Sequence, residues 1–389
     1  MSTVKTLIGQ AVDSLADDLE ELSHRIHANP ELGYQEVKAA GWLADFLAAQ
    51  GFAVERGVAG VETAFRATID NGPGPTIAIM CEYDALPAIG HACGHNVIGA
   101  AGAGAGAALA RVRATLPRGR ILVVGTPAEE GGGGKVRLIQ AGVFESVDAA
   151  MMVHGWDRWI GHQDLLGIVR VGFECTGKAA HAAADPWEGV NALDAVIQTF
   201  NNVSMLRQQI RPDARIHGIV TNGGAAANII PEAASALFYV RAAKLDYMWE
   251  LHGRVLACAE GAAQATGCSL KVVKNENPYE PMKRNETLLG VFRANLAGLG
   301  AVESPEVRDR LGSSDVGNVS QVIPAIQPLV KIAPDGTPIH SRAFEAAAAG
   351  PLAREGMLIA AKSMAMTTFD LLDDPALVAK AKQEFEARG

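Results

Sequence analysis

Three apolar runs in this chain each end in a group of polar, chemically reactive residues. The runs and the groups that follow them are residues 76–81 with Glu82-Tyr83-Asp84, residues 121–126 with Pro127-Ala128-Glu129-Glu130, and residues 149–153 with His154. Short β-branched runs that alternate with longer helical patterns are typical of an α/β sheet with helices packed on it. If the strands are parallel, all three groups lie on one sheet edge, where open α/β folds bind ligands. The sequence therefore predicts an α/β fold with a mainly parallel sheet flanked by helices.

A fourth polar group, His91-Ala92-Cys93-Gly94-His95-Asn96, follows the first run after a short loop. A cysteine and a histidine separated by one residue, here Cys93 and His95, can bind one metal ion from the same side of the backbone. A second interpretation stays open, in which Cys93 is a nucleophile with His91 or His95 as its base. The group lies between this short loop and a predicted helix, so it stays near the end of the first run and can reach the same sheet edge as the other three.

The adjacent Glu129 and Glu130 can divide between them the work of metal-assisted hydrolysis. Neighbouring side chains that leave a strand point in roughly opposite directions. One carboxylate can therefore bind an ion while the other takes a proton from the attacking water. Four glycines at 131–134 follow the pair and let the backbone approach a ligand closely. The alternative is that both glutamates are simply solvated at a strand-to-loop junction.

The middle of the chain has a different pattern from its two ends. Residues 169–278 show the order strand, helix, strand, strand, helix, strand, which makes a complete small α+β unit. We therefore expect a first domain of residues 1–168 and 279–389, interrupted by an inserted α+β domain. In the first domain we expect one N-terminal helix over residues 5–27 and a late strand over residues 325–332.

The composition argues against several classes of function. A formal net charge of −9, without any Lys/Arg cluster, works against binding of nucleic acid. Five irregularly spaced cysteines argue against a disulfide framework and favour a reducing compartment, so we expect a cytoplasmic protein. No stretch approaches the roughly 18 uninterrupted apolar residues of a membrane span. We therefore expect neither nucleic acid nor membrane as a partner.

Eight segments carry a resemblance to a known family and follow one another in consistent order up to His340. They are residues 24–33, 84–87, 90–96, 127–130, 154–155, 177–182, 228–231 and 314–320. This series resembles the M20 family of metallopeptidases and amidohydrolases, which points to a zinc-exopeptidase-like catalytic domain. Glu82 stands where many members have a metal-binding histidine, and Asn96 where auxin-conjugate hydrolases usually carry aspartate. Both residues favour the branch of aminobenzoyl-glutamate hydrolase subunits and the peptidase M20 domain-containing protein 2 type.

The resemblance implies a metal centre and a catalytic base. Two divalent ions, zinc or manganese, would be held by five ligands, namely Cys93, His95, Glu130, His154 and His340. Cys93 would bridge the two ions. Glu129 would be the general base, and Asp84 would orient a residue bound to the metal.

The resemblance also implies that the inserted domain is a lid that joins two subunits into a homodimer or a larger oligomer. His181 would reach into the partner's site and stabilise the tetrahedral oxyanion. Asn228 and Arg241 would bind the substrate, and the guanidinium fork of Arg241 suits a carboxylate.

We therefore expect a cytoplasmic metal-dependent amidohydrolase. Its small-molecule substrate would be an N-acyl amino acid, an aminobenzoyl-glutamate-like conjugate or a dipeptide. One alternative is a hydrolytic deaminase of a small aromatic amine, which uses the same fold and the same kind of activated water. A second alternative is a non-catalytic metal-binding paralogue.

Overall fold

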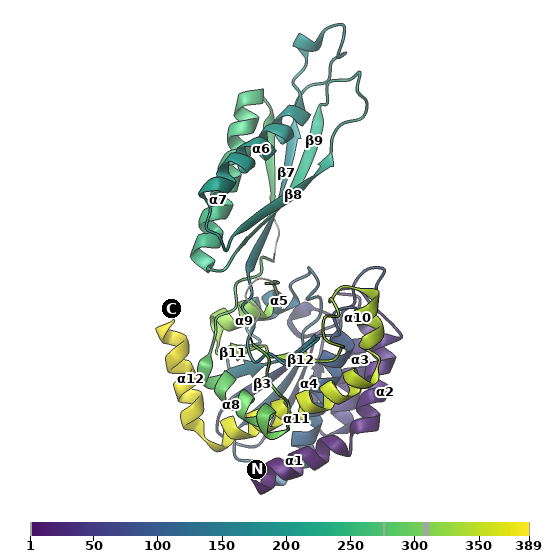
Figure 1. Ribbon diagram of the computed structural model, residues 1–389, viewed down its shortest axis with the longest axis vertical. Helices are drawn as coiled ribbons and strands as arrows, with labels where there is room; N and C mark the ends of the chain where they lie inside the picture. Colours follow the sequence, from purple (N-terminus) through teal and green to yellow (C-terminus); the bar gives the residue numbers. More distant parts are fainter. Residues whose placement is uncertain (1, 275–276, 306–310, 389) are drawn as a thin grey trace. The chain divides into compact units, whose positions relative to one another are not determined.

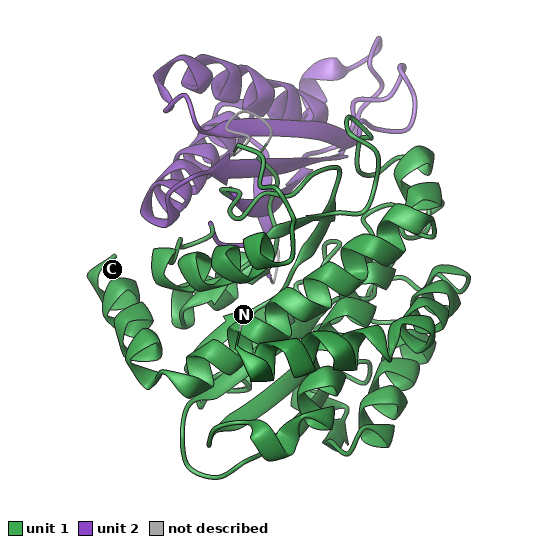
Figure 2. Ribbon diagram, turned by 60° about the horizontal axis from the view of Figure 1, so that its bottom comes forward, with its two compact units in different colours: residues 1–164, 282–389 green, residues 165–281 purple. Residues whose placement is uncertain are grey.

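The chain is divided into two compact units, each with its own hydrophobic core (Figure 2). The computed structural model describes residues 2–274, 277–305 and 311–388. Unit 1 comprises residues 1–164 and 282–389, and unit 2 comprises residues 165–281. The insertion thus begins at residue 165 rather than 169 and ends at residue 281 rather than 278.

Unit 1 contains a six-stranded sheet in the order β1-β2-β4-β3-β5-β11. Figure 1 labels two of these strands, β3 and β11. The strands are β1 (Ala53–Arg56), β2 (Phe65–Asp70), β3 (Thr76–Cys81), β4 (Arg120–Gly125), β5 (Ala149–Met151) and β11 (Ala325–Ile326). Strands β4, β3, β5 and β11 are parallel to one another, whereas at one edge β2 pairs antiparallel with β4 and β1 pairs antiparallel with β2. Every residue of the central β3 is buried, as expected for a strand covered on both faces. The predicted mainly parallel α/β sheet is confirmed.

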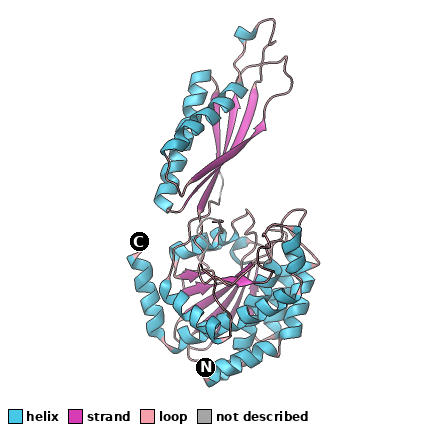
Figure 3. Cartoon of the chain, viewed as in Figure 1, coloured by secondary structure: helices cyan, strands magenta, loops and turns pink. Residues whose placement is uncertain are grey.

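Helices surround this sheet (Figure 3). They are α1 (Thr3–Asp13), α2 (Ala16–His27), α3 (Val37–Ala49), α4 (His95–Arg111), α5 (Gly134–Gln140), α8 (Glu286–Gly298), α9 (Val316–Val322), α10 (Arg342–Ala347), α11 (Pro351–Asp373) and α12 (Pro375–Ala387), with 3₁₀ turns at Val58–Gly60 and Arg113–Thr115. Small residues let α4 lie close to the sheet. A Cβ atom at Gly102 would lie 2.5 Å from Cys81 Sγ, and one at Gly106 would lie 2.5 Å from Val123 Cγ2.

Two predictions of local structure were wrong. The expected helix over residues 5–27 is two helices, which are separated at Ser14 and Leu15. At the end of α1 the Ser14 hydroxyl donates to the Ala11 carbonyl at 2.8 Å, and local bonds of this kind compete with a continuous helix. The expected strand over residues 325–332 is also two strands. Pro328, which has no N–H to donate, separates β11 from β12 (Leu329–Lys331). Strand β12 instead pairs with β6 (His154–Trp156) in a separate two-stranded sheet.

Unit 2 contains a four-stranded antiparallel sheet with two helices on one face. The elements are β7 (Gly167–Thr176), α6 (Ala192–Leu206), β8 (Arg215–Asn222), β9 (Ala233–Ala242), α7 (Leu245–Thr266) and β10 (Ser269–Lys274), with 3₁₀ turns at Pro186–Glu188 and Arg207–Gln209. The sheet order is β10-β7-β9-β8. Along β9 buried residues alternate with half-exposed ones, so one face of the sheet carries the core and the other is open.

No helix in the part of the chain that the structure describes has the length and apolar character needed to cross a membrane.

Candidate metal centre

The parallel strands bring the polar groups of unit 1 together, and six side chains form overlapping clusters there. Within each cluster the potential ligand atoms lie within 4.8 Å of one another. The clusters are Cys93 with His95 and His154, Cys93 with Glu130 and His340, and His95 with Glu129 and Glu130. All five residues predicted as metal ligands, and the predicted base, therefore lie in one place. Cys93, His95 and Glu130 each belong to two of the three clusters.

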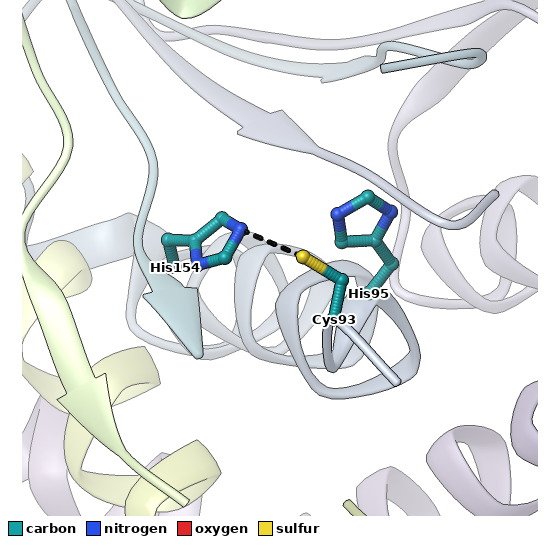
Figure 4. A group of neighbouring side chains, drawn as sticks. All are labelled: Cys93, His95 and His154. Atoms are coloured by element: carbon teal, nitrogen blue, oxygen red, sulfur yellow. Dashed lines mark hydrogen bonds between the residues drawn. The ribbon is translucent and has the colours of Figure 1, made fainter. Parts of the chain in front are cut away.

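The two histidines nearest to Cys93 are oriented through their Nδ1 atoms. His95 Nδ1 lies 2.9 Å from the Asp84 carbonyl oxygen, and His154 Nδ1 lies 2.9 Å from the Gly155 carbonyl oxygen. A carbonyl oxygen only accepts, so each Nδ1 donates its proton to that oxygen, and Nε2 is the ring nitrogen left for the cluster. His154 Nε2 lies 3.4 Å from Cys93 Sγ (Figure 4). Both rings are therefore held in an orientation in which Nε2 is the candidate ligand atom.

Two buried polar atoms of the cluster support a cation site. His95 Nε2 and Glu130 Oε1 are shielded from solvent and have no hydrogen-bond partner among the described residues. Polar atoms buried in this way cost free energy unless something satisfies them. A divalent cation would satisfy both atoms, and a set of one thiol, three imidazoles and one carboxylate is compatible with zinc. The residues fit a divalent metal centre.

His340 joins the cluster from the C-terminal part of unit 1. Its backbone N–H donates to the Ala92 carbonyl at 2.9 Å, beside Cys93. Its Nε2 lies 3.5 Å from Glu130 Oε1. The backbone of His340 has a φ of +57°, a left-handed conformation that is unfavourable for a residue other than glycine. Strain of this kind is concentrated at functional sites.

The adjacent carboxyl groups of Glu129 and Glu130 have pKa values shifted in opposite directions. Burial, and then the charge of Glu130, raise the pKa of Glu129 well above its ordinary value. Burial also acts to raise the pKa of Glu130, but contact with His340 and the charge of His95 lower it overall. The lowered pKa of Glu130 favours its ionised form, and the raised pKa of Glu129 favours uptake of a proton at that carboxyl group.

The Cys93 thiol does not have the properties of an activated nucleophile. Burial, and then the charge of Glu130, raise the pKa of this thiol well above its ordinary value. Reactive cysteines have lowered pKa values in electropositive surroundings. The environment of Cys93 therefore argues against the interpretation as a thiol enzyme.

Asp84 connects two of the candidate ligands. Its Oδ1 lies 3.1 Å from His95 Nδ1, and its Oδ2 accepts the Glu130 N–H at 2.9 Å. Although burial acts to raise the pKa of Asp84, the charge of His95 lowers it overall, so the carboxylate stays ionised. These contacts are compatible with the orienting role that the family resemblance implies for Asp84, which stays a prediction.

A buried ion network beside the cluster was not found by sequence reasoning. Lys135 is fully buried, and its Nζ lies 2.5 Å from Glu82 Oε1 and 2.6 Å from Asp315 Oδ1. The other oxygen of Glu82 lies 3.5 Å from His95 Nε2. A lysine at the start of a short apolar helix, directly after four glycines, was the only local signal for this network.

Unit 2 brings two of its three predicted residues close together. The Ala182 N–H donates to the Asn228 carbonyl at 3.0 Å, which places the segments of His181 and Asn228 side by side, and both residues are exposed. His181 Nδ1 accepts the backbone N–H groups of Ala183 and Ala184 at 3.2 and 3.1 Å. The neutral ring therefore carries its proton on Nε2, where it can be donated to an oxyanion.

Arg241 lies near the other end of β9, well away from these two residues. The eight residue steps from Ala233 to Arg241 span about 26 Å of strand. Burial, and then the guanidinium of Arg170, lower the pKa of Arg241. Two neighbouring guanidinium groups at this end of the sheet suit an anionic group.

Comparisons with known proteins cover most of the chain. The sequence profile of peptidase family M20/M25/M40 matches residues 58–351. The whole chain is 38% identical to the Xaa-Arg dipeptidase of Mus musculus and covers 93% of it. It is 29% identical to a subunit of the p-aminobenzoyl-glutamate hydrolase of Escherichia coli (strain K12), over 99% of this chain and 95% of that protein. The solved structure of the aminobenzoyl-glutamate utilization protein from Klebsiella pneumoniae has a similar fold, with a TM-score of 0.76, 20% identity, and coverage of 93% of this chain and 97% of the other.

Proposed function

This chain belongs to the M20 family of peptidases, and we propose that it is a metal-dependent amidohydrolase that cleaves a small amide carrying a free carboxylate. The single observation that supports this most strongly is the clustering, in unit 1, of five candidate metal ligands with Glu129. The membership itself was predicted from the motif series and is confirmed by the family match.

In this proposal two divalent ions, zinc or manganese, are held by Cys93, His95, Glu130, His154 and His340. Such ions lower the pKa of water and polarise the carbonyl of the substrate. Glu129 takes the proton from the attacking water and delivers it to the leaving nitrogen. Asp84 holds the Nδ1 side of His95, which leaves Nε2 as the candidate ligand atom, and it accepts the Glu130 N–H at the same time.

The arginines of unit 2 and the relatives support this substrate class. Relatives of this chain are named as a dipeptidase and as part of an aminobenzoyl-glutamate hydrolase. Dipeptides and aminobenzoyl-glutamate both carry a free carboxylate beside the amide, and Arg241 with its neighbour Arg170 suits such a group. We propose that Asn228 contacts the substrate as well.

We propose further that unit 2 forms a homodimer, and that the exposed His181 donates its Nε2 proton to the oxyanion in the partner's site. We also propose a cytoplasmic location. All five cysteines of the chain are free in the structure, and oxidation of Cys93 would remove a ligand.

Metal removal tests the proposed function. We expect the purified protein to hydrolyse members of a panel of dipeptides, N-acyl amino acids and aminobenzoyl-glutamate. Activity should be lost after dialysis against a chelator and return with zinc or manganese. Full activity after metal removal would overturn the proposal, and release of ammonia from aryl amines without any amide cleavage would favour the deaminase instead.

A variant separates the base from the ligands. Glu129→Gln should lower kcat by about 10²–10⁴-fold, because the proton acceptor is lost. Its metal content, measured by elemental analysis, should equal that of the wild type. The matched control is Glu174→Gln on the open sheet face of unit 2, which should leave kcat unchanged. A fully active Glu129→Gln variant would exclude Glu129 as the base.

A further inference from the structure

The turn that carries Glu129 is held through its backbone by carboxylates from three other parts of unit 1. The Glu130 N–H donates to Asp84 Oδ2 at 2.9 Å, and the Lys135 N–H donates to Asp315 Oδ2 at 3.0 Å. Asp84 and Asp315 also bind side chains of the site, namely His95 and Lys135. The third carboxylate is that of Glu36, whose Oε1 accepts the Ala128 N–H at 2.8 Å. Glu36 contributes to none of the steps described so far.

Ala128, the residue directly before Glu129, has an unfavourable backbone conformation. Its φ is +59°, in the left-handed region that residues other than glycine rarely occupy. Its carbonyl accepts the Gly132 and Gly133 N–H groups at 3.1 and 2.8 Å, and its N–H is held by Glu36. A strained conformation persists only where its surroundings fix it in this way. The direction in which the chain leaves Ala128 decides where the Glu129 side chain lies.

The surroundings of Ala128 are shaped to this conformation. A Cβ atom at Gly132 would lie 2.7 Å from Ala128 Cβ, and one at Gly33 would lie 3.0 Å from it. Both neighbours must therefore be small. Gly33 lies three residues before Glu36, so one short segment supplies both the space for Ala128 and the acceptor for its N–H.

Glu36 itself is fully buried at the N-terminal end of α3. A buried carboxyl group is costly and is kept where its hydrogen bonds matter. Burial, followed by the charge of Asp84, raises the pKa of Glu36 to about 7. The neutral and ionised forms both offer an oxygen to the Ala128 N–H, and glutamine offers an oxygen of the same reach.

We propose that Glu36 is a positioning residue for the catalytic base, which holds the Ala128 N–H and thereby keeps Glu129 beside His95. The inference rests on the proposed function, because it takes Glu129 as the base. Among the described residues, Glu36 has no hydrogen bond or ion pair with a candidate metal ligand, and it acts through the backbone of the turn.

Three variants test this proposal. Glu36→Ala should lower kcat by about 10²-fold, because small displacements of a catalytic group have effects of this size. Its KM and metal content should stay at the wild-type values. Glu36→Gln should keep most of the wild-type kcat, because the amide oxygen still accepts the Ala128 N–H. The matched control is Glu31→Ala, since the Glu31 carboxylate accepts the N–H groups of Lys38 and Ala39 in the first turn of α3 and does not contact Ala128. It should destabilise the same helix and leave kcat unchanged.

A second measurement is independent of activity. In hydrogen–deuterium exchange, Glu36→Ala should speed exchange in the peptide that contains Ala128 and the glycines after it, whereas Glu31→Ala should not. If Glu36→Ala does not fold, Glu36→Met, which retains most of the volume, takes its place. Wild-type kcat and exchange in the alanine or methionine variant would overturn the proposal, and so would equal losses in the glutamine and alanine variants. An inactive metal-loaded wild type would instead reject the proposed function, while the exchange measurement would still decide whether Glu36 holds the turn.

Discussion

The two units of this chain differ in how far they bury the charged and polar residues of interest. Unit 1 buries them: Lys135 and the candidate ligand His95 are fully buried and bound to carboxylates. Unit 2 leaves His181 and Asn228 exposed beside a sheet with one open face, and Arg241 is half-buried. Buried charges interact strongly and are held in fixed positions, whereas exposed ones are screened by water. In the proposed function, unit 1 therefore assembles the metal centre from its own buried residues, and unit 2 supplies groups that are exposed in the single chain.

The largest effect on stability is expected from the buried network of unit 1. Lys135→Met should lower the free energy of unfolding by about 3–5 kcal/mol, because Glu82 and Asp315 would stay buried without their cation. Urea denaturation of the metal-free protein measures this loss. Adding Glu82→Gln to the same variant should recover part of the stability, since one uncompensated charge is removed. A loss below about 1 kcal/mol in the single variant would mean that burial in unit 1 does not strengthen its ion pairs.

The next effect concerns catalysis by the exposed histidine of unit 2. His181→Ala should lower kcat by about 10²-fold through loss of the oxyanion donor, with unchanged stability and metal content. Mixing His181→Ala subunits with Glu129→Gln subunits tests whether His181 acts across a dimer. After subunit exchange, about half of the dimers would contain one subunit of each variant. Each of these dimers has one intact site out of two, so about a quarter of the wild-type activity should return. If mixing restores no activity, His181 does not act in the partner's site, and any role of unit 2 lies within its own chain.

The smallest effect is expected from a lysine at the surface of unit 2. Lys271 Nζ lies 2.9 Å from Glu174 Oε2, with 74% of the lysine side chain exposed. Lys271→Met should change the free energy of unfolding by less than about 1 kcal/mol, because exposed ion pairs contribute little. The same urea experiment as for Lys135 provides the comparison. A loss as large as that of Lys135→Met would remove the distinction between the two units.

Sequence reasoning was most successful where the signal was local. The end of β3 at Cys81, followed by Glu82 and Asp84, was found because an apolar run stops abruptly at polar residues. The order of strands and helices in unit 2 was predicted for the same reason, and the family resemblance supplied the candidate ligands. The break of the first helix at Ser14 was missed, since it depends on one hydroxyl bonding back to the Ala11 carbonyl.

Long-range contacts account for most of what the sequence did not reveal. Lys135 binds Glu82 and Asp315, which are far from it in the chain, and lysine is almost never fully buried unless it is paired. The role of Glu36 was also not predicted. Its partner is the backbone N–H of Ala128, and the alanine side chain gives no sign of such a contact. The separation of Arg241 from His181 also needed the fold, because it is set by the length of β9.

The ligand cluster is interrupted in the chain by unit 2. Cys93, His95, Glu130 and His154 precede unit 2, whereas His340 follows it. During synthesis from the N-terminus, four of the five candidate ligands leave the ribosome before the insertion, and His340 only after it. In the proposed function, an ion bound early would be held by an incomplete set until the C-terminal part of unit 1 folds into place. A product truncated before residue 340 would therefore release its ion more readily.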